Sequence, residues 1–165
     1  MESLPLSQKR YVGRYPGTVP PRYSVVRTEQ PEPPPDKRFV LIVDDDPFFR
    51  SLFKVMLGQI GIHLADIQEA EDSATAFEIC DTNPVDLVFC DYHLPRMRSK
   101  DGLEIIRELR QSHPDIPVFM ITSENSEALV GEVCAVGATG HLLKPINLRT
   151  LKRILVSCRA PAVQP

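Results

Sequence analysis

Polar residues end four of the apolar runs in this 165-residue sequence. Asp44 and Asp45 follow the first run, Asp91 follows a later one, Thr122–Ser123 end the next, and Lys144 follows the last. If these runs are parallel strands, their carboxyl ends meet at one edge of a sheet, where open α/β folds bind ligands. We therefore expect three carboxylates, a hydroxyl pair and an ammonium group to share one crevice.

The chemistry of such a crevice is that of phosphoryl transfer. Three carboxylates at close range repel one another, so a proton or a cation must enter. Mg²⁺ is the natural guest, because proteins usually hold it with one or two carboxylates and leave its other positions to water or phosphate oxygens. A lysine and a hydroxyl can neutralise and hold a transferring phosphoryl group. An aspartate carboxylate can be the attacking oxygen, which gives an acyl phosphate.

The spacing of apolar residues predicts five strands that alternate with five helices. Strands are expected at residues 39–43, 63–68, 85–90, 117–122 and 141–143. Helices are expected at residues 46–61, 73–82, 101–112, 125–137 and 147–157. This alternation, with short connections, is typical of a parallel sheet covered by helices on both faces. The run at 63–68 contains Asp66 and Gln68, which suits an edge strand.

Local signals mark where the predicted helices begin and end. Asp46 can cap the first helix, and Pro47 suits its first turn. The apolar residues of this helix that fall on one face are Phe48, Leu52, Val55 and Met56. Gly61 and Gly137 stand where helices should stop, because glycine readily adopts the positive φ found there.

Residues 1–38 differ in composition from the rest of the chain. They hold half of the sixteen prolines, three of the four tyrosines, and seven Lys/Arg against four Asp/Glu. Proline removes backbone donors and fixes φ, so we predict a mostly extended N-terminal arm. The arm is either a solvated tether or a docking segment that uses its tyrosines and basic residues.

Several classes of protein are disfavoured. The net charge of −3 does not favour direct nucleic-acid binding. We expect no membrane span, because no apolar run approaches ~20 residues, and we expect no signal peptide. The four cysteines lack CxxC spacing and are expected to be reduced thiols of a cytoplasmic protein, with Cys90 in the core. His63 and His113 are expected at the surface, and no histidine pair has the spacing of a zinc site.

The segments LIVDDDP, VFCDYHLP with a following DG, MITS and GATGHLLKP, in this order and spacing, resemble the receiver domain of bacterial two-component response regulators. The resemblance covers residues 38–158. It implies a flavodoxin-like (βα)5 fold, a doubly wound parallel sheet with strand order 2-1-3-4-5. We therefore divide the chain into an arm at 1–38, a receiver domain at 39–158 and a short tail at 159–165.

The resemblance also implies roles for single residues. The implied Mg²⁺ site comprises Asp44, Asp45, Asp91 and the backbone carbonyl of His93. Asp91 is the implied phosphoacceptor, Asp45 a direct metal ligand, and Asp44 a ligand through water. Thr122 would hydrogen-bond the bound phosphoryl group and Lys144 would pair with it.

Two departures from the family pattern matter. His141 stands three residues before Lys144, where the family usually has Tyr or Phe as the switch residue. It is either a tolerated substitution or a switch of different size, polarity and pH sensitivity. The basic segment Arg96–Lys100 makes the loop before Asp101-Gly102 three residues longer than usual. Its Arg96, Arg98 and Lys100 could attract a dianionic donor or meet an acidic partner, or the segment could be a solvated insertion. The Lys144-Pro145 bond is often cis in this family.

The implied function is that of a stand-alone receiver in a phosphorelay. A histidine kinase or histidine phosphotransfer protein would phosphorylate Asp91. The change would pass through Thr122 and His141 to the surface formed by the elements predicted at 125–137, 141–143 and 147–157, where a target protein would bind. Such a protein catalyses only its own phosphoryl transfer and dephosphorylation, so it is not expected to be an enzyme in the usual sense. The resemblance also allows a homodimer.

Three alternatives stay in view. The chain could be a receiver-like interaction module that is never phosphorylated. It could be a fragment of a longer regulator, in which APAVQP at residues 160–165 begins a linker. The spacing Asp44-x-Asp46 also resembles the nucleophile motif of haloacid-dehalogenase-like phosphatases. Those enzymes need a further acidic pair after the lysine, and no acidic residue follows Lys144.

Overall fold

The structure is a computed structural model that describes residues 38–94 and 100–158. The elements follow one another as β1 (Phe39–Val43), α1 (Pro47–Gln59), β2 (Ile67–Ala70), α2 (Ser73–Thr82), β3 (Val85–Asp91), α3 (Gly102–Ser112), β4 (Val118–Thr122), α4 (Glu127–Ala135), β5 (Gly140–Leu143) and α5 (Leu148–Ser157). The predicted alternation of strands and helices is confirmed. The predictions for the N-terminal arm, the tail and most of the basic loop concern residues 1–37, 159–165 and 95–99, which lie outside the described residues.

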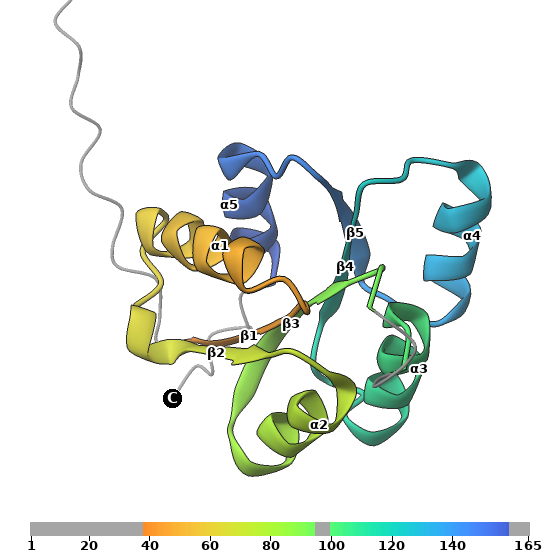
Figure 1. The fold of residues 1–165 in the computed structure, drawn as a ribbon, viewed down its shortest axis with the longest axis horizontal. Helices are drawn as coiled ribbons and strands as arrows, with labels where there is room; N and C mark the ends of the chain where they lie inside the picture. Colours follow the sequence, from red (N-terminus) through yellow and green to blue (C-terminus); the bar gives the residue numbers. More distant parts are fainter. Residues whose placement is uncertain (1–37, 95–99, 159–165) are drawn as a thin grey trace, which may run out of the picture. The chain divides into compact units, whose positions relative to one another are not determined.

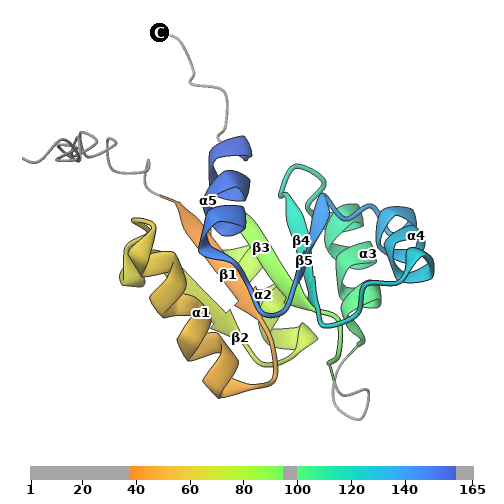
Figure 2. The same cartoon turned by 90° about the horizontal axis from the view of Figure 1, so that it is seen from above.

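All five strands are parallel, and their order across the sheet is β2-β1-β3-β4-β5. Helices α1 and α5 pack on one face of the sheet, and α2, α3 and α4 pack on the other (Figures 1 and 2). The predicted flavodoxin-like fold is therefore confirmed. Because the strands are parallel, their carboxyl ends lie along one edge of the sheet.

The strand β1 shows why a continuous apolar run suits the middle of this sheet. Successive side chains point to opposite faces. Val40 and Ile42 pack with α1 and α5, whereas Leu41 and Val43 pack with α2, α3 and α4. All four side chains are fully buried. Each such burial stabilises the fold by about 1.5–3 kcal/mol.

The second strand does not lie where the sequence predicted it. The predicted strand at 63–68 is replaced by a short 3-10 helix at Leu64–Asp66, followed by β2 at Ile67–Ala70. The backbone N–H of Asp66 donates to the carbonyl of His63 at 2.9 Å, which closes the helical turn. Pairing with β1 begins only at Ile67. The strand lies at the edge of the sheet, as predicted.

Helix α1 begins as predicted but buries a different face. The Asp46 carboxylate accepts from the N–H of Phe48 at 2.9 Å and caps the helix. The fully buried side chains are Phe53 and Leu57. Three of the four residues on the predicted apolar face are instead exposed: Phe48, Leu52 and Val55. The helix carries apolar residues on two faces, so periodicity alone does not identify the one that meets the sheet.

Gly61 and Gly137 follow α1 and α4 with φ of 98° and 82°, as predicted for helix stops. All four cysteines are free thiols. Burial raises the pKa of the Cys80 thiol to about 11 and raises that of the fully buried Cys90 further.

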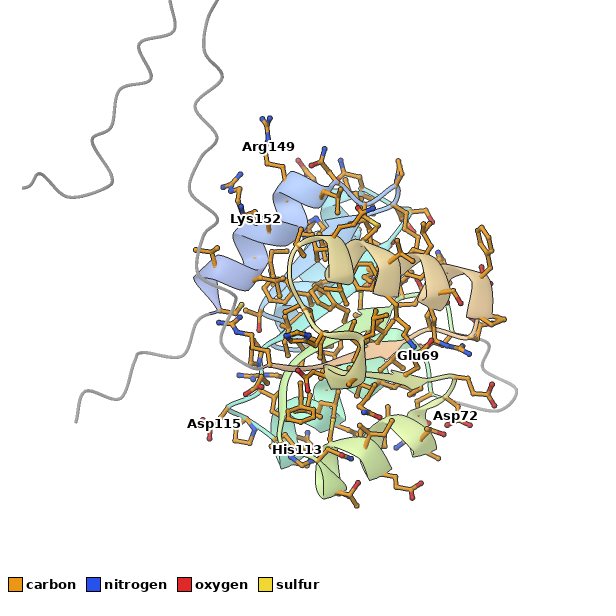
Figure 3. The ribbon with its side chains drawn as sticks, turned by 90° about the vertical axis from the view of Figure 1, so that its left-hand side faces the viewer. Glu69, Asp72, His113, Asp115, Arg149 and Lys152 are labelled. Carbon is orange, nitrogen blue, oxygen red and sulfur yellow. The ribbon has the colours of Figure 1, made fainter. Side chains whose placement is uncertain are left out.

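The described helices are too short or too polar to cross a membrane. The exposed side chains of Arg149 and Lys152 project from the outer side of α5 (Figure 3).

Candidate functional site

The three predicted carboxylates lie together at the carboxyl edge of the sheet. Asp44 and Asp45 follow β1, and Asp91 ends the neighbouring strand β3. One carboxylate oxygen from each residue lies within 4.8 Å of the others. Asp44 and Asp91 are buried, whereas Asp45 is exposed. The predicted convergence at one crevice is therefore present in the structure.

Backbone groups hold the two buried carboxylates in place. The N–H of Asp46 donates to Asp44 Oδ1 at 2.8 Å, and the N–H of Asp44 donates to the carbonyl of Ala70 on β2 at 3.1 Å. The N–H of His93 donates to Asp91 Oδ2 at 2.8 Å. The turn that follows each strand thus orients the carboxylate before it.

Gly102, the first residue of α3, lies close to the backbone of Asp91. A Cβ atom placed on Gly102 would lie 2.2 Å from the Asp91 carbonyl oxygen, so only glycine fits at this position. The preceding residue, Asp101, caps α3: its carboxylate accepts from the N–H of Glu104 at 2.9 Å. The carboxylate of Glu104 accepts from the N–H of Asp101 in return, at 3.1 Å. This capping box fixes where the chain re-enters the fold beside Asp91.

Lys144 reaches the same crevice from the end of β5. Its Nζ lies 2.7 Å from Asp91 Oδ1 and 3.3 Å from Asp44 Oδ2. Its own N–H donates to the carbonyl of Thr122 at 2.8 Å, which ties it to β4. Burial alone would lower the pKa of Lys144, but the hydrogen bonds and charges of Asp91 and Asp44 outweigh burial and raise that pKa. Lys144 is therefore a firmly charged ammonium group. The Lys144-Pro145 bond is cis, as the resemblance implied.

The electrostatics of the crevice favour a cation. Burial raises the pKa of Asp44, and the nearby Asp91 charge adds to this, although the hydrogen bond from Asp46 and the Lys144 ammonium lower it. Three carboxylates face one ammonium group, so the cluster carries excess negative charge. Oxygen donors of this kind, with one of them open to solvent, fit a hard divalent cation such as Mg²⁺.

The remaining predicted residues lie at different distances from this cluster. Thr122 is fully buried at the end of β4, next to Ile121, which pairs with Asp91 across the sheet. Its Oγ1 accepts from the N–H of Glu124 at 3.0 Å. His93 is exposed beside Asp91. His141 is half-buried on β5 and lines a separate cavity of about 300 Å³ between β5 and the start of α5.

Sequence reasoning missed two residues of α1 that touch the site. The ring centroid of Phe49 lies 3.9 Å from Lys144 Nζ. Nη1 of Arg50 donates to the carbonyl of Asp44 at 2.6 Å, and its Nε lies 3.5 Å from Glu69 of β2. The predicted cap at Asp46 could have indicated both residues. Phe49 and Arg50 follow it by three and four positions, so they lie one helical turn after the cap, near the ends of the strands.

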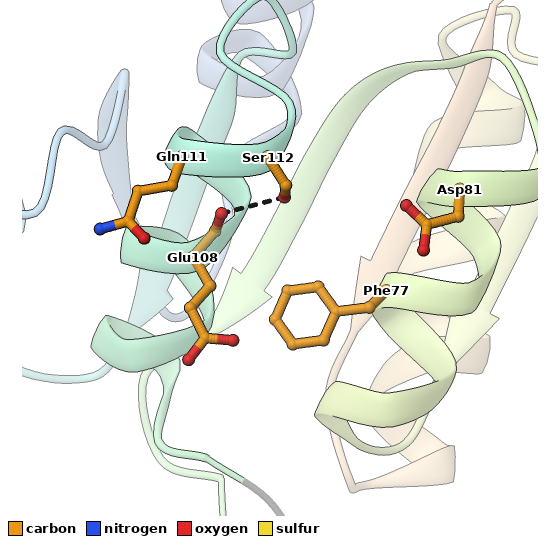
Figure 4. A pocket seen from close by; sticks show the side chains of 5 residues that line it. All are labelled: Phe77, Asp81, Glu108, Gln111 and Ser112. Carbon is orange, nitrogen blue, oxygen red and sulfur yellow. Dashed lines mark hydrogen bonds between the residues drawn. The ribbon is translucent and has the colours of Figure 1, made fainter.

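A second polar cavity lies between α2 and α3, away from the acidic cluster. Its volume is about 560 Å³, and its lining residues are Phe77, Asp81, Glu108, Gln111 and Ser112 (Figure 4). Lys100 is the last residue of the basic segment. It forms an ion pair with Glu108, and its Nζ lies 5.4 Å from the Phe77 ring centroid. His113, predicted at the surface, is half-buried, and its Nε2 lies 3.0 Å from Asp81 Oδ1.

Comparison with known proteins places this chain and its fold in a family. The sequence profile of the response regulator receiver domain matches residues 40–156. The transcriptional regulatory protein AruR of Pseudomonas aeruginosa is 38% identical over 68% of this chain and 45% of its own length. The response regulator protein PilR of the same species is 32% identical over 71% of this chain and 25% of its own length. The chain thus spans less than half the length of either relative.

Solved structures agree with the sequence comparison. The chemotaxis protein CheY4 of Vibrio cholerae has a TM-score of 0.65 and 30% identity, over 74% of this chain and 98% of its own. The receiver domain of NtrX from Brucella abortus has a TM-score of 0.63 and 28% identity, over 72% of this chain and 96% of its own. Receiver domains are generally signalling modules, and phosphorylation and Mg²⁺ binding at an acidic pocket are typical of them. This chain belongs to the family of response regulator receiver domains of two-component systems.

Proposed function

We propose that this receiver accepts a phosphoryl group on Asp91 from a histidine kinase or histidine phosphotransfer protein, and signals by a change in its protein contacts. The observation that carries the proposal is the setting of Asp91. Its carboxylate is buried at the end of β3, 2.7 Å from the Lys144 ammonium and beside Asp44 and Asp45. The carboxylate is held on both oxygens, by Lys144 and by the N–H of His93.

In the proposed reaction a carboxylate oxygen of Asp91 attacks the phosphorus of a phosphohistidine. A new P–O bond forms, the P–N bond breaks, and the histidine leaves with the electron pair of that bond. Lys144 neutralises a phosphoryl oxygen, and the Thr122 hydroxyl donates to another. Mg²⁺ held by Asp44, Asp45, Asp91 and the His93 carbonyl would supply further positive charge to the phosphoryl oxygens.

The wider assignment is part of the same proposal. Residues 1–38 are assigned to an arm, residues 39–158 to the receiver and residues 159–165 to a tail, in a cytoplasmic protein. Thr122 and His141 pass the phosphorylated state to a target protein on the α4-β5-α5 face. A second candidate is a receiver within a longer regulator, which the short share of AruR and PilR that this chain covers favours.

Intact-mass measurement tests the proposal. The protein is incubated with Mg²⁺ and a small phosphodonor such as acetyl phosphate. The wild type should gain one phosphoryl group, and an excess of chelator should prevent the gain. Asp91→Asn should gain none, whereas Asp115→Asn, at an exposed aspartate on a loop (Figure 3), should behave as wild type. A phosphoryl group on Asp91→Asn would refute the assignment.

A further inference from the structure

The ammonium group of Lys144 is enclosed by more than its two carboxylate partners. The aromatic ring of Phe49, in the first turn of α1, lies with its centroid 3.9 Å from Nζ. Asp91 and Asp44 contact the same nitrogen at 2.7 and 3.3 Å. A cation within about 6 Å of an aromatic centroid is attracted to the face of the ring, most strongly where water is excluded.

The Phe49 ring is itself held in position by the core. It stacks on Phe53, with centroids 5.8 Å apart and an interplanar angle of 17°. Phe53 is fully buried and meets Phe89 edge to face at 5.0 Å. Phe89 lies on β3, two residues before Asp91. The strand that presents the carboxylate therefore also supports, through two rings, the group that contacts the lysine.

We propose that Phe49 is a positioning residue for phosphoryl transfer, whose ring keeps the Lys144 ammonium against Asp91 and Asp44. A lysine side chain carries its charge at the end of a flexible aliphatic chain, so the carboxylates alone do not restrict the rotamer by which the ammonium group reaches them. The Lys144 side chain is partly exposed, and the ring closes one side of the ammonium to water. A preplaced charge stabilises a transition state better than one that must be ordered during the reaction. The inference rests on the proposed phosphorylation of Asp91.

Substitution at Phe49 tests the role, because leucine keeps an apolar side chain and removes the aromatic face. We expect Phe49→Leu to lower the phosphorylation rate about three- to tenfold at saturating Mg²⁺ and phosphodonor, the size of a partly desolvated cation–π contact. Phe49→Tyr keeps the face and should stay within about twofold of wild type. The matched control is Phe48→Leu, the neighbouring and exposed phenylalanine, which should leave the rate unchanged.

A double variant separates positioning from packing. In the Lys144→Ala background, measured over longer incubation, Phe49→Leu should cause no further loss of rate, because its target is gone. Thermal unfolding monitors folding of every variant. Equal losses from Phe49→Leu with and without Lys144 would show that the ring acts by packing alone, and a Phe49→Leu rate equal to that of Phe48→Leu would also overturn the inference. A wild type that gains no phosphoryl group would overturn the proposed function itself.

Discussion

Two clusters in this fold bring together a lysine, a carboxylate and an aromatic ring, yet they differ in almost every physical respect. The site cluster consists of Lys144, Asp44, Asp91 and Phe49, and the α2–α3 cluster consists of Lys100, Glu108 and Phe77. The carboxylate side chains of the site cluster are 2% and 5% exposed, whereas that of Glu108 is 41% exposed. The ring centroid lies 3.9 Å from the lysine Nζ in the site cluster and 5.4 Å from it in the α2–α3 cluster.

The two clusters therefore differ in burial rather than in residue type. Exposed ion pairs are screened by water and contribute about 0–1 kcal/mol. In a buried cluster the charges interact strongly, and the loss of one member leaves the others without compensation. We therefore expect the site cluster to be less tolerant of change, and substitutions of its lysine and of Asp91 have matched substitutions in the α2–α3 cluster.

The largest expected difference is in phosphorylation rate. Lys144→Ala should slow the reaction of Asp91 with a small phosphodonor by about 100-fold or more, the usual cost of removing one charge-stabilising donor. Lys100→Ala should change the rate by less than about twofold, because the ion pair that it removes is exposed and lies away from Asp91. Time courses by intact mass at fixed salt measure both rates. Similar losses in the two variants would end the distinction between the clusters.

The same two variants should differ in stability. Lys144→Ala leaves Asp44 and Asp91 without their cation, so the free energy of unfolding should fall by about 1–3 kcal/mol in chelator, a value reduced because Lys144 is partly exposed. Lys100→Ala should lower it by less than about 1 kcal/mol. Urea titration followed by circular dichroism gives both values. Added Mg²⁺ should recover part of the loss in Lys144→Ala, because it replaces the missing positive charge.

Asp44 should make the metal-free protein less stable as pH rises. Burial and the Asp91 charge raise the pKa of Asp44 in the folded protein. A raised folded pKa adds stability that is complete below the unfolded value, near 3.8, and is lost as pH rises through the folded value. Asp44→Asn removes this dependence, and at pH 7 it should stabilise the metal-free protein by up to about 1 kcal/mol while weakening Mg²⁺ binding.

The control for the Asp44 prediction is Asp115→Asn, at an exposed position. Urea titrations of wild type, Asp44→Asn and Asp115→Asn are carried out in chelator from pH 4 to pH 8. They give the difference in the free energy of unfolding between each variant and wild type at each pH. A constant difference between Asp44→Asn and wild type across this range would contradict the prediction.

The smallest expected effect is the coupling energy within the α2–α3 cluster. A double-mutant cycle with Lys100→Ala and Glu108→Gln should give about 0.2–1 kcal/mol, and high salt should reduce it. The corresponding cycle with Lys144→Ala and Asp91→Asn should give a larger value that is less sensitive to salt. A larger coupling between Lys100 and Glu108 would mean that the exposed pair is not screened as its burial indicates.

The charged members of the site cluster were easier to predict from the sequence than its aromatic member, Phe49. Asp44, Asp91, Thr122 and Lys144 were identifiable because each ends an apolar run, and parallel strands bring such ends together whatever the details of packing. The contact of Phe49 with Lys144 depends on which way α1 faces. The first helix has two apolar faces, and the choice between them is made by packing against the sheet rather than by periodicity.

The misplaced edge strand has a similar cause. The segment from His63 to Gln68 contains enough apolar residues for a strand, but backbone pairing with β1 starts only at Ile67. Before that point a local turn satisfies the backbone at lower cost than an unpaired strand would. The cavity beside His141 could not be predicted from the sequence either, because it depends on how α5 packs beside β5.

The close fit of Gly102 against Asp91 has a consequence for how this protein can be varied. The chain leaves the neighbourhood of Asp91 at the buried Leu94 and returns at a glycine that touches the Asp91 carbonyl, locked by the capping box of Asp101. Because a Cβ atom at position 102 would overlap the Asp91 carbonyl oxygen, any larger residue there would displace either the start of α3 or the end of β3. The position of the acceptor carboxylate is therefore tied to the first residue of a helix as well as to its own strand.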